Sequence, residues 1–122
     1  MKRILVVDDN KDILQVVQLV LEIRGFEVMT IWDGQETMQA VKHFSPDLIL
    51  LDVLLGNVSG IAICNEIKSD PELKKPCIIM FSAHAKGEDV LKLCPADGFI
   101  AKPFDIHQLS ETIKEQLDGC EK

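Results

Sequence analysis

The sequence predicts an α/β protein in which five helices flank a five-stranded parallel sheet. Short apolar segments alternate with segments of helical hydrophobic spacing along the chain, which is the pattern of strand–helix–strand units. Residues 46–52 are apolar at nearly every position, which is typical of a central strand buried on both faces. Polar residues follow four of the expected strands, and the right-handed crossovers between parallel strands bring those strand ends to one edge of the sheet.

The first half of the chain contains three expected strands and two helices. A β-branched strand over residues 3–7 is followed by apolar residues at helical spacing over residues 13–21, and Gly25 then takes the place of a C′ glycine. Residues 26–31 form the second strand. The sequence from Asp33 to Glu36 has the form of a capping box, which opens a helix that runs to about His43 and leads to the third strand.

The second half contains the remaining strands and helices. A glycine-containing loop over residues 54–59 leads to a helix over residues 60–68, and a fourth strand over residues 76–81 ends on Ser82. A helix over residues 85–93 is the weakest of the set, because Gly87 interrupts it. The fifth strand covers residues 98–101, and the last helix runs from residue 105 to about residue 117. Residues 119–122 are expected to be loose.

Length and charge restrict the class of protein. A chain of 122 residues is expected to form one domain over residues 1–122, since it is too short for a second core. It has 13 Lys and Arg against 20 Asp and Glu, and the net charge of −7 repels nucleic-acid phosphates and anionic membranes. No stretch approaches the roughly 18 apolar residues of a membrane span. We therefore expect a soluble, cytoplasmic protein without a nucleic-acid or membrane partner.

The cysteines are expected to be buried and reduced. Cys64, Cys77, Cys94 and Cys120 lie 13, 17 and 26 residues apart, which excludes the paired C-x-x-C spacing of metal and redox motifs. Disulfides are rare in the cytosol, where a buried free thiol behaves as a small apolar side chain.

Five polar residues at strand ends predict a cation and phosphoryl site: Asp8, Asp9, Asp52, Ser82 and Lys102. Carboxylates held within a few ångströms repel one another by about 4 kcal/mol per pair at an effective dielectric near 20, so a cation is required. Mg2+ prefers oxygen ligands and suits an open carboxylate group beside a phosphoryl ligand. The lysine would offer a point charge to a phosphoryl oxygen and the serine a hydroxyl donor. The peptide bond before Pro103 can be cis, which would aim the lysine.

Each of these residues also has an ordinary interpretation. The Asp8–Asp9 pair could be a turn favoured by the dipole of the next helix. Ser82 could be a turn residue, and Lys102 a solvated surface lysine. The convergence of all of them at one sheet edge favours the site.

Four motifs together resemble the receiver domains of bacterial two-component response regulators. They are Val6-Val7-Asp8-Asp9, Leu50-Leu51-Asp52-Val53, Phe81-Ser82-Ala83 and Phe99-Ile100-Ala101-Lys102-Pro103-Phe104, in the family's order over essentially the whole chain. The resemblance implies the flavodoxin-like receiver fold, a doubly wound sheet with strand order 2-1-3-4-5.

The resemblance also implies a role for each site residue. Asp52 would be the phosphoacceptor. Asp9 and Asp52 would bind Mg2+ directly, Asp8 would bind it through water, and the backbone carbonyl of Leu54 would complete the protein ligands. Ser82 and Lys102 would contact the phosphoryl oxygens.

Three features concern the switch and its surroundings. Phe99 would be the aromatic that turns inward when Ser82 moves, although core packing alone also explains an aromatic there. Gly56 stands where many receivers have proline, so that loop is expected to be more mobile. The stretch from Ser82 to Lys102 is about two residues shorter than is usual in the family, and it contains Pro95. The fourth helix is therefore expected to be short or distorted.

The predicted function is that of a stand-alone, single-domain receiver. It accepts a phosphoryl group on Asp52 from a sensor histidine kinase or histidine phosphotransfer protein with Mg2+, and signals by a conformational shift. It is not an ordinary enzyme, since it catalyses only its own phosphotransfer and slow dephosphorylation. Leu54 and His84 occupy the positions two residues after Asp52 and two after Ser82, where side chains in this family influence the water that hydrolyses the aspartyl phosphate. The chain is expected to be a monomer or a weak phosphorylation-dependent dimer.

Two alternatives stay open at this point. A pseudo-receiver would have the same fold and dock a partner without phosphorylation. A metal-dependent phosphohydrolase would use Asp52 as a nucleophile, but it would need a second carboxylate where this chain has Leu54.

Overall fold

A five-stranded parallel sheet forms the centre of the molecule in a computed structural model, which describes residues 1–83 and 86–120. The strand order is β2-β1-β3-β6-β7, which is 2-1-3-4-5 when the strands of this sheet are numbered along the chain, as predicted. The strands are β1 (Arg3–Val7), β2 (Glu27–Ile31), β3 (Leu48–Asp52), β6 (Cys77–Ser82) and β7 (Gly98–Ala101).

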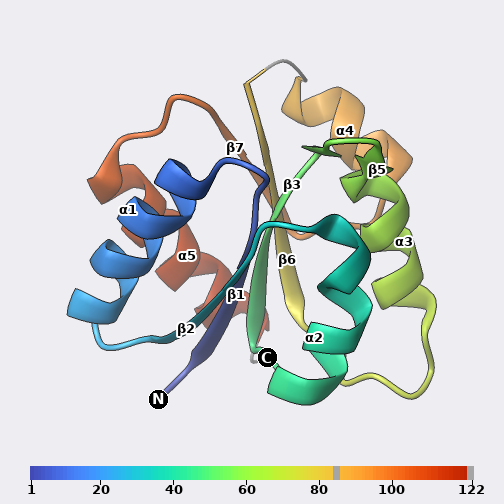
Figure 1. Cartoon of the computed structure of the whole chain (residues 1–122), viewed down its shortest axis with the longest axis horizontal. Helices are drawn as coiled ribbons and strands as arrows, with labels where there is room; N and C mark the ends of the chain where they lie inside the picture. Colours follow the sequence, from blue (N-terminus) through green and yellow to red (C-terminus); the bar gives the residue numbers. More distant parts are fainter. Residues whose placement is uncertain (84–85, 121–122) are drawn as a thin grey trace.

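Helices cover both faces of this sheet, as the sequence predicts (Figure 1). Two of them, α1 and α5, pack on one face, whereas α2, α3 and α4 pack on the other. The helices are α1 (Lys11–Ile23), α2 (Thr37–Phe44), α3 (Gly60–Ser69), α4 (Gly87–Leu93) and α5 (Ile106–Cys120).

The central strand β3 shows how the sequence produces these layers. All five of its residues are buried, and successive side chains point to opposite faces. Leu48 and Leu50 pack in the core under α1 and α5, while Ile49 and Leu51 pack in the core under α2, α3 and α4. A strand that is apolar at every position is therefore required, which is what the segment before Asp52 provides.

Two helix boundaries follow the predicted signals. Gly25 has a φ of 93°, and its amide donates to the carbonyl of Glu22 at 3.0 Å just beyond the end of α1. The side chain of Asp33 accepts a hydrogen bond from the amide of Gln35, as an N-cap should. The chain first forms a short 3-10 turn, η1 (Gly34–Glu36), and then enters α2.

Three details differ from the sequence-based expectations. Within the predicted loop, β4 (Leu54–Leu55) and β5 (Val58–Ser59) pair as an antiparallel hairpin around Gly56, which has a φ of 64°. The helix predicted over 85–93 begins at Gly87, so this glycine starts α4 instead of interrupting it, and Ala85 lies outside the described residues. The last helix continues to Cys120, past the predicted end at 117, so residues 119 and 120 of the tail expected to be loose are helical. Residues 121 and 122 lie outside the described residues.

The expectation of four reduced cysteines is wrong for one pair. Cys77 at the start of β6 and Cys120 at the end of α5 form a disulfide, with their Cα atoms 6.0 Å apart. The two residues are 43 positions apart, so only the folded chain brings them together. Cys64 and Cys94 are free and buried, as predicted, and burial beside Cys94 raises the pKa of the Cys64 thiol to about 12.

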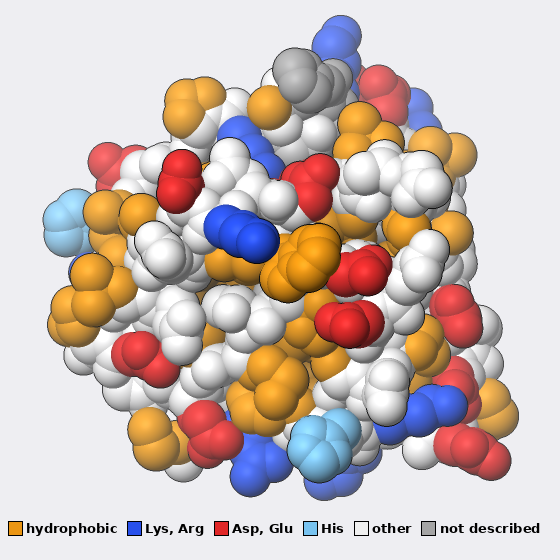
Figure 2. All heavy atoms as spheres, in the orientation of Figure 1, with side chains coloured by type: hydrophobic (Ala, Val, Ile, Leu, Met, Phe, Trp, Pro, Cys, Tyr) orange, Lys and Arg blue, Asp and Glu red, His pale blue; other side chains and the backbone are white. Residues whose placement is uncertain are grey.

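The surface mixes side chains of both charge signs with scattered apolar ones on the face seen in Figure 2. No helix among the described residues has the length and apolar character that a membrane crossing requires.

Candidate functional site

The predicted polar residues meet at the carboxyl edge of the sheet, where four adjacent strands end. Asp8 directly follows β1, and Asp52 and Ser82 are the last residues of β3 and β6. Lys102 follows β7, and its amide donates to the carbonyl of Ser82 at 2.9 Å. A cavity of about 270 Å³ opens there, lined by Asp8, Asp9, Asn10, Asp52, Leu54, Ser82, Ala83 and Lys102.

The ammonium group of Lys102 joins two of the carboxylates. Its Nζ lies 2.7 Å from an oxygen of Asp8 and 3.0 Å from an oxygen of Asp52. Asp8 is fully buried and Asp52 is 6% exposed, so both ion pairs lie in a medium that screens charge weakly. The same Nζ lies 4.5 Å from the centre of the Phe81 ring, a cation–π contact that the sequence did not predict.

Backbone amides hold the second oxygens of these carboxylates. Asp8 accepts from the amide of Asn10 at 2.8 Å, and Asp52 accepts from the amide of Leu54 at 3.2 Å. Asp9, which is exposed, accepts from the amide of Gly56 at 3.2 Å. The hairpin of β4 and β5 is thus tied to the acidic cluster, because two of the donors belong to it.

Burial and ion pairing act on the titration of this cluster in opposite directions. Burial raises the pKa of Asp8, and although the hydrogen bonds from Lys102 and Asn10 lower it, the pKa stays above its usual value. Burial alone would lower the pKa of Lys102, but hydrogen bonds to Asp8 and Asp52 outweigh it and the pKa of the ammonium is raised. Lys102 therefore stays charged.

The donor set fits a divalent hard cation. One carboxylate oxygen from each of Asp8, Asp9 and Asp52 lies within 4.8 Å of the others. Three carboxylates against the single ammonium of Lys102 leave two negative charges, which one divalent ion would balance. The oxygens face an open cavity, which leaves room for the water ligands that Mg2+ keeps.

The other predicted residues take different positions. Leu54 lines the cavity with a side chain that is 56% exposed, and Ser82 lines it while 4% exposed. Phe99 is half-buried in β7 and packs against the core under α2, α3 and α4, away from the cavity lining. The peptide bond between Lys102 and Pro103 is cis. His84 lies outside the described residues.

Sequence reasoning missed two glycines that close packing requires, one beside Asp52 and one beside Phe99. A Cβ on Gly60 would overlap the backbone carbonyl of Asp52, and the Gly60 amide donates to the carbonyl of Val53 at 2.8 Å. A Cβ on Gly87 would lie 2.7 Å from the ring of Phe99. The only sequence signal was a glycine at the first position of a helix, where a residue with a side chain is usual.

Fold and site define a class, namely doubly wound α/β proteins with an acidic cluster and a lysine at the carboxyl edge of the sheet. The chain belongs to the response regulator receiver domain family, because that family's model matches residues 4–114. It is thus a receiver domain of two-component signalling, a signalling domain and not an ordinary enzyme.

Curated relatives and solved structures agree with this assignment. The chain is 34% identical over 121 residues to the alkaline phosphatase synthesis transcriptional regulatory protein PhoP of Bacillus subtilis (strain 168), covering 98% of this chain and 50% of PhoP. It is 34% identical over 118 residues to the DNA-binding response regulator MtrA of Mycobacterium tuberculosis (strain ATCC 25618 / H37Rv), and the match covers 95% of this chain and 50% of MtrA. The chain therefore spans about half the length of these relatives.

A solved CheY-like response regulator receiver domain protein from Methanospirillum hungatei JF-1 superposes with a TM-score of 0.87. It is 31% identical, and the match covers 99% of this chain and 97% of that one. The agreement over nearly the full length of both chains supports the receiver fold as a whole and not only its motifs.

Replacing Lys102 by Met should lower the free energy of unfolding, and more so at about pH 8 than at about pH 5. Loss of the ammonium leaves Asp8 and Asp52 buried without their cation, which costs about 3 kcal/mol when both are ionised. Burial already raises the pKa of Asp8, and loss of the Lys102 hydrogen bond, which lowers it, raises it further above its value in the unfolded chain; stability is therefore retained at low pH, where this carboxyl is protonated, and is lost as the pH rises. Urea unfolding at both pH values measures this.

Lys92→Met is the matched control, because Lys92 is an exposed cation in the last turn of α4. It should cost less than about 0.5 kcal/mol at either pH. An equal loss for the two variants, or a Lys102→Met loss that does not depend on pH, would contradict the analysis of the cluster.

Proposed function

We propose that this receiver accepts a phosphoryl group on Asp52 from the phosphohistidine of a sensor histidine kinase or histidine phosphotransfer protein, in a Mg2+-dependent reaction. The observation that supports it most is the position of Asp52. Its carboxylate lies at the end of the central strand, with the Lys102 ammonium 3.0 Å away and two further carboxylates within reach of a shared cation. In this proposal Asp9 and Asp52 bind the metal directly, Asp8 binds it through water, and Leu54 contributes its carbonyl.

The transfer forms one bond and breaks one. An oxygen of Asp52 attacks phosphorus, the N–P bond of the donor breaks, and its electron pair returns to the imidazole nitrogen. When bound, Mg2+ would supply positive charge beside the transferring group. Lys102, which already contacts Asp52, moves to a phosphoryl oxygen, and Ser82 donates its hydroxyl to another.

The rival function is a pseudo-receiver that docks a partner without being phosphorylated. The intact cluster supports the phosphoacceptor instead, because burying two aspartates and the lysine that bridges them costs free energy, and docking a partner does not require such a cluster. Docking alone would be served by an apolar edge.

The proposal includes the organisation of the chain. Residues 1–122 form one receiver domain, supported by the family match over 4–114. It exists as a monomer or a weak phosphorylation-dependent dimer. The names of PhoP and MtrA place transcriptional regulation and DNA binding in proteins about twice as long. The absence of a nucleic-acid partner therefore stays a prediction, argued for these 122 residues from their net charge of −7.

Incubation with acetyl phosphate and Mg2+ should add one phosphoryl group to the protein, detected as intact mass. Asp52→Ala should show no gain, because the attacking oxygen is gone. Asp9→Ala should also show no gain in mass, because Asp9 is a direct ligand in the proposed metal site. Chelation of the metal should have the same effect.

Asp12→Ala is the matched control, since Asp12 is an exposed aspartate in the first turn of α1 that does not line the cavity. It should be phosphorylated at the wild-type rate. A wild-type protein that gains no mass would favour the pseudo-receiver, and an Asp9→Ala protein that gains mass at the wild-type rate would remove Asp9 from the metal site.

The switch is expected to involve Ser82 and Phe99. Phosphorylation draws Ser82 towards Asp52, and the space left behind it admits the ring of Phe99, which now packs beside Gly87. Addition of beryllium fluoride as a phosphoryl mimic should therefore shift the NMR signals of the Phe99 ring and of the α4 amides. Lys102→Ala should permit some phosphorylation but abolish this response. Identical spectra with and without the mimic in the wild-type protein would refute the switch.

The aspartyl phosphate is expected to be long-lived for a receiver. Leu54 beside the cavity carries no group that can orient a hydrolytic water, and its exposed side chain shields the phosphoryl face. Leu54→Asn should therefore shorten the half-life, by about two- to tenfold for one added hydrogen bond of 0.5 to 1.5 kcal/mol. Decay of the phosphorylated mass after removal of the donor measures this; decay equal to or slower than wild type would reject the shielding argument.

A further inference from the structure

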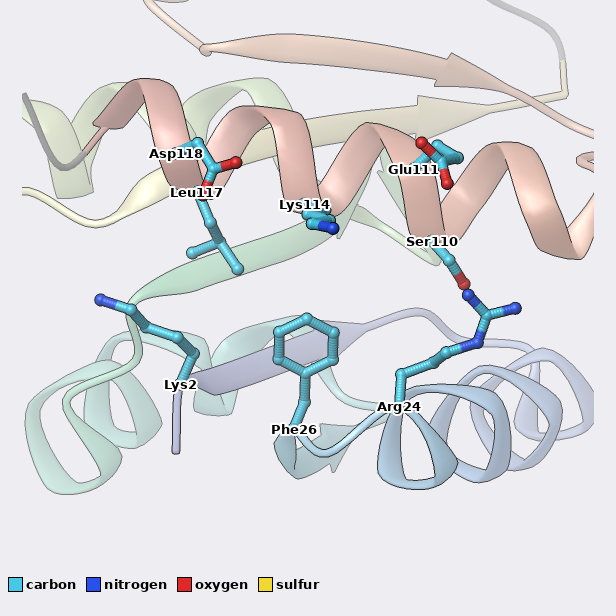
Figure 3. A pocket seen from close by; sticks show the side chains of 8 residues that line it. All are labelled: Lys2, Arg24, Phe26, Ser110, Glu111, Lys114, Leu117 and Asp118. Carbon is cyan, nitrogen blue, oxygen red and sulfur yellow. The ribbon is translucent and has the colours of Figure 1, made fainter.

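A second cavity lies at the opposite end of the molecule from the acidic cluster. It has a volume of about 400 Å³ and lies between α5, the start of β1 and the connection from α1 to β2. Figure 3 shows α5 above it, with Phe26 pointing up from below and Arg24 and Lys2 on either side of that ring. The size is that of small-molecule sites in proteins.

The lining combines an apolar centre with cationic edges. Phe26 is half-buried against the core under α1 and α5, and Leu117 of α5 faces it across the cavity. Arg24, Lys2 and Lys114 bring positive charge to the lining. This arrangement suits a flat ring on the phenylalanine and an anion beside the cations.

One polar group in this cavity has an unmet hydrogen-bonding capacity. Ser110 is only 6% exposed, and its buried hydroxyl has no hydrogen-bond partner among the described residues. Such a group costs free energy until a partner reaches it. In Figure 3 this hydroxyl points from α5 towards the guanidinium of Arg24. Arg24 forms no ion pair with any residue that the structure describes.

We propose that this cavity binds a nucleoside monophosphate or a compound of the same chemistry, an aromatic ring that carries a phosphate group. The ring lies against Phe26. The phosphate accepts hydrogen bonds from the Arg24 guanidinium, with the Lys114 ammonium nearby, and it reaches the buried Ser110 hydroxyl when the Arg24 side chain, towards which that hydroxyl points, moves to bind it. A phosphate matches these donors better than a carboxylate, because it offers three terminal oxygens instead of two.

Two carboxylates on the rim limit where in the cavity an anion can bind. Glu111 and Asp118 also line the cavity and would repel an anion. Figure 3 places Asp118 at the end of α5 away from Arg24, and Glu111 at the Ser110 end but on the upper side of the helix, away from the Phe26 ring. The phosphate therefore belongs at the Arg24–Ser110 end, and affinity should fall when salt screens the cations.

Titration of the full chain with AMP and GMP, without divalent cations, tests the proposal by calorimetry and by NMR. Binding should shift the amides of Phe26 and Ser110. Adenosine, which lacks the anion, and inorganic phosphate, which lacks the ring, should each bind at least about tenfold more weakly than AMP. If neither nucleotide binds, or if inorganic phosphate binds as tightly as AMP, the proposal is overturned.

Variants separate a specific site from general attraction. Arg24→Gln should weaken AMP binding about tenfold and Ser110→Ala about fivefold, since each removes a donor to the phosphate. Lys92→Gln, which removes a cation from the end of a different helix, should have no effect, and a loss equal to that of Arg24→Gln would overturn the proposal.

Ser110→Ala has a second readout. The thermal stability of the ligand-free variant should equal or exceed that of the wild type, because the hydroxyl has no hydrogen bond to lose within residues 1–83 and 86–120. A clear destabilisation without ligand would show that the hydroxyl serves the fold, and would overturn its assignment to the ligand. These tests use unphosphorylated protein, and the cavity at the sheet's carboxyl edge shares no residue with this one, so failure of the proposed phosphorylation would leave them valid.

Discussion

The contact of the Lys102 ammonium with Asp8 and Asp52 is the interaction on which the rest of the site depends. Two carboxylates at the ends of neighbouring strands are held together in a buried place, and one cation makes this possible. Desolvation opposes the arrangement and the hydrogen bonds offset it, so removal of either kind of partner leaves a buried charge. The fold holds this cluster at high free energy. A phosphoryl group or a metal ion that bound there would meet charged groups that are already in position.

The precision of the site comes from β3 and its neighbours. Because β3 is buried on both faces, Asp52 has little freedom to move along or across the sheet. Gly60 then lets α3 start directly against the backbone carbonyl of Asp52, where a side chain would not fit. The hairpin after β3 adds the amides of Leu54 and Gly56 to the carboxylates. The Asp52 carboxylate is therefore positioned by the backbone and the core.

Local patterns explain why so much of this was predictable. The strand before Asp52 and the C′ glycine after α1 are signals within a few residues, and the order of polar strand ends follows from right-handed crossovers. The contacts that were missed join distant positions. The disulfide links residues 43 apart, and the overlap at Gly60 depends on how α3 meets β3. The sequence shows Ser110 only as one serine in a helix, whereas the packing shows that its hydroxyl is buried without a partner in the described part of the chain.

The disulfide also defines how a change at the site can travel. Strand β6 begins at Cys77 and ends at Ser82, and α5 begins a few residues after Lys102 and ends at Cys120. The two elements are therefore bonded covalently at the far edge and meet at the site through the hydrogen bond from Lys102 to Ser82. If Ser82 and Lys102 shift in the proposed switch, we expect α5 to tilt about its fixed end more than it slides, because the disulfide holds that end. The expected tilt is greatest at the start of α5, a few residues after Lys102, and smallest near Leu117 in the second cavity.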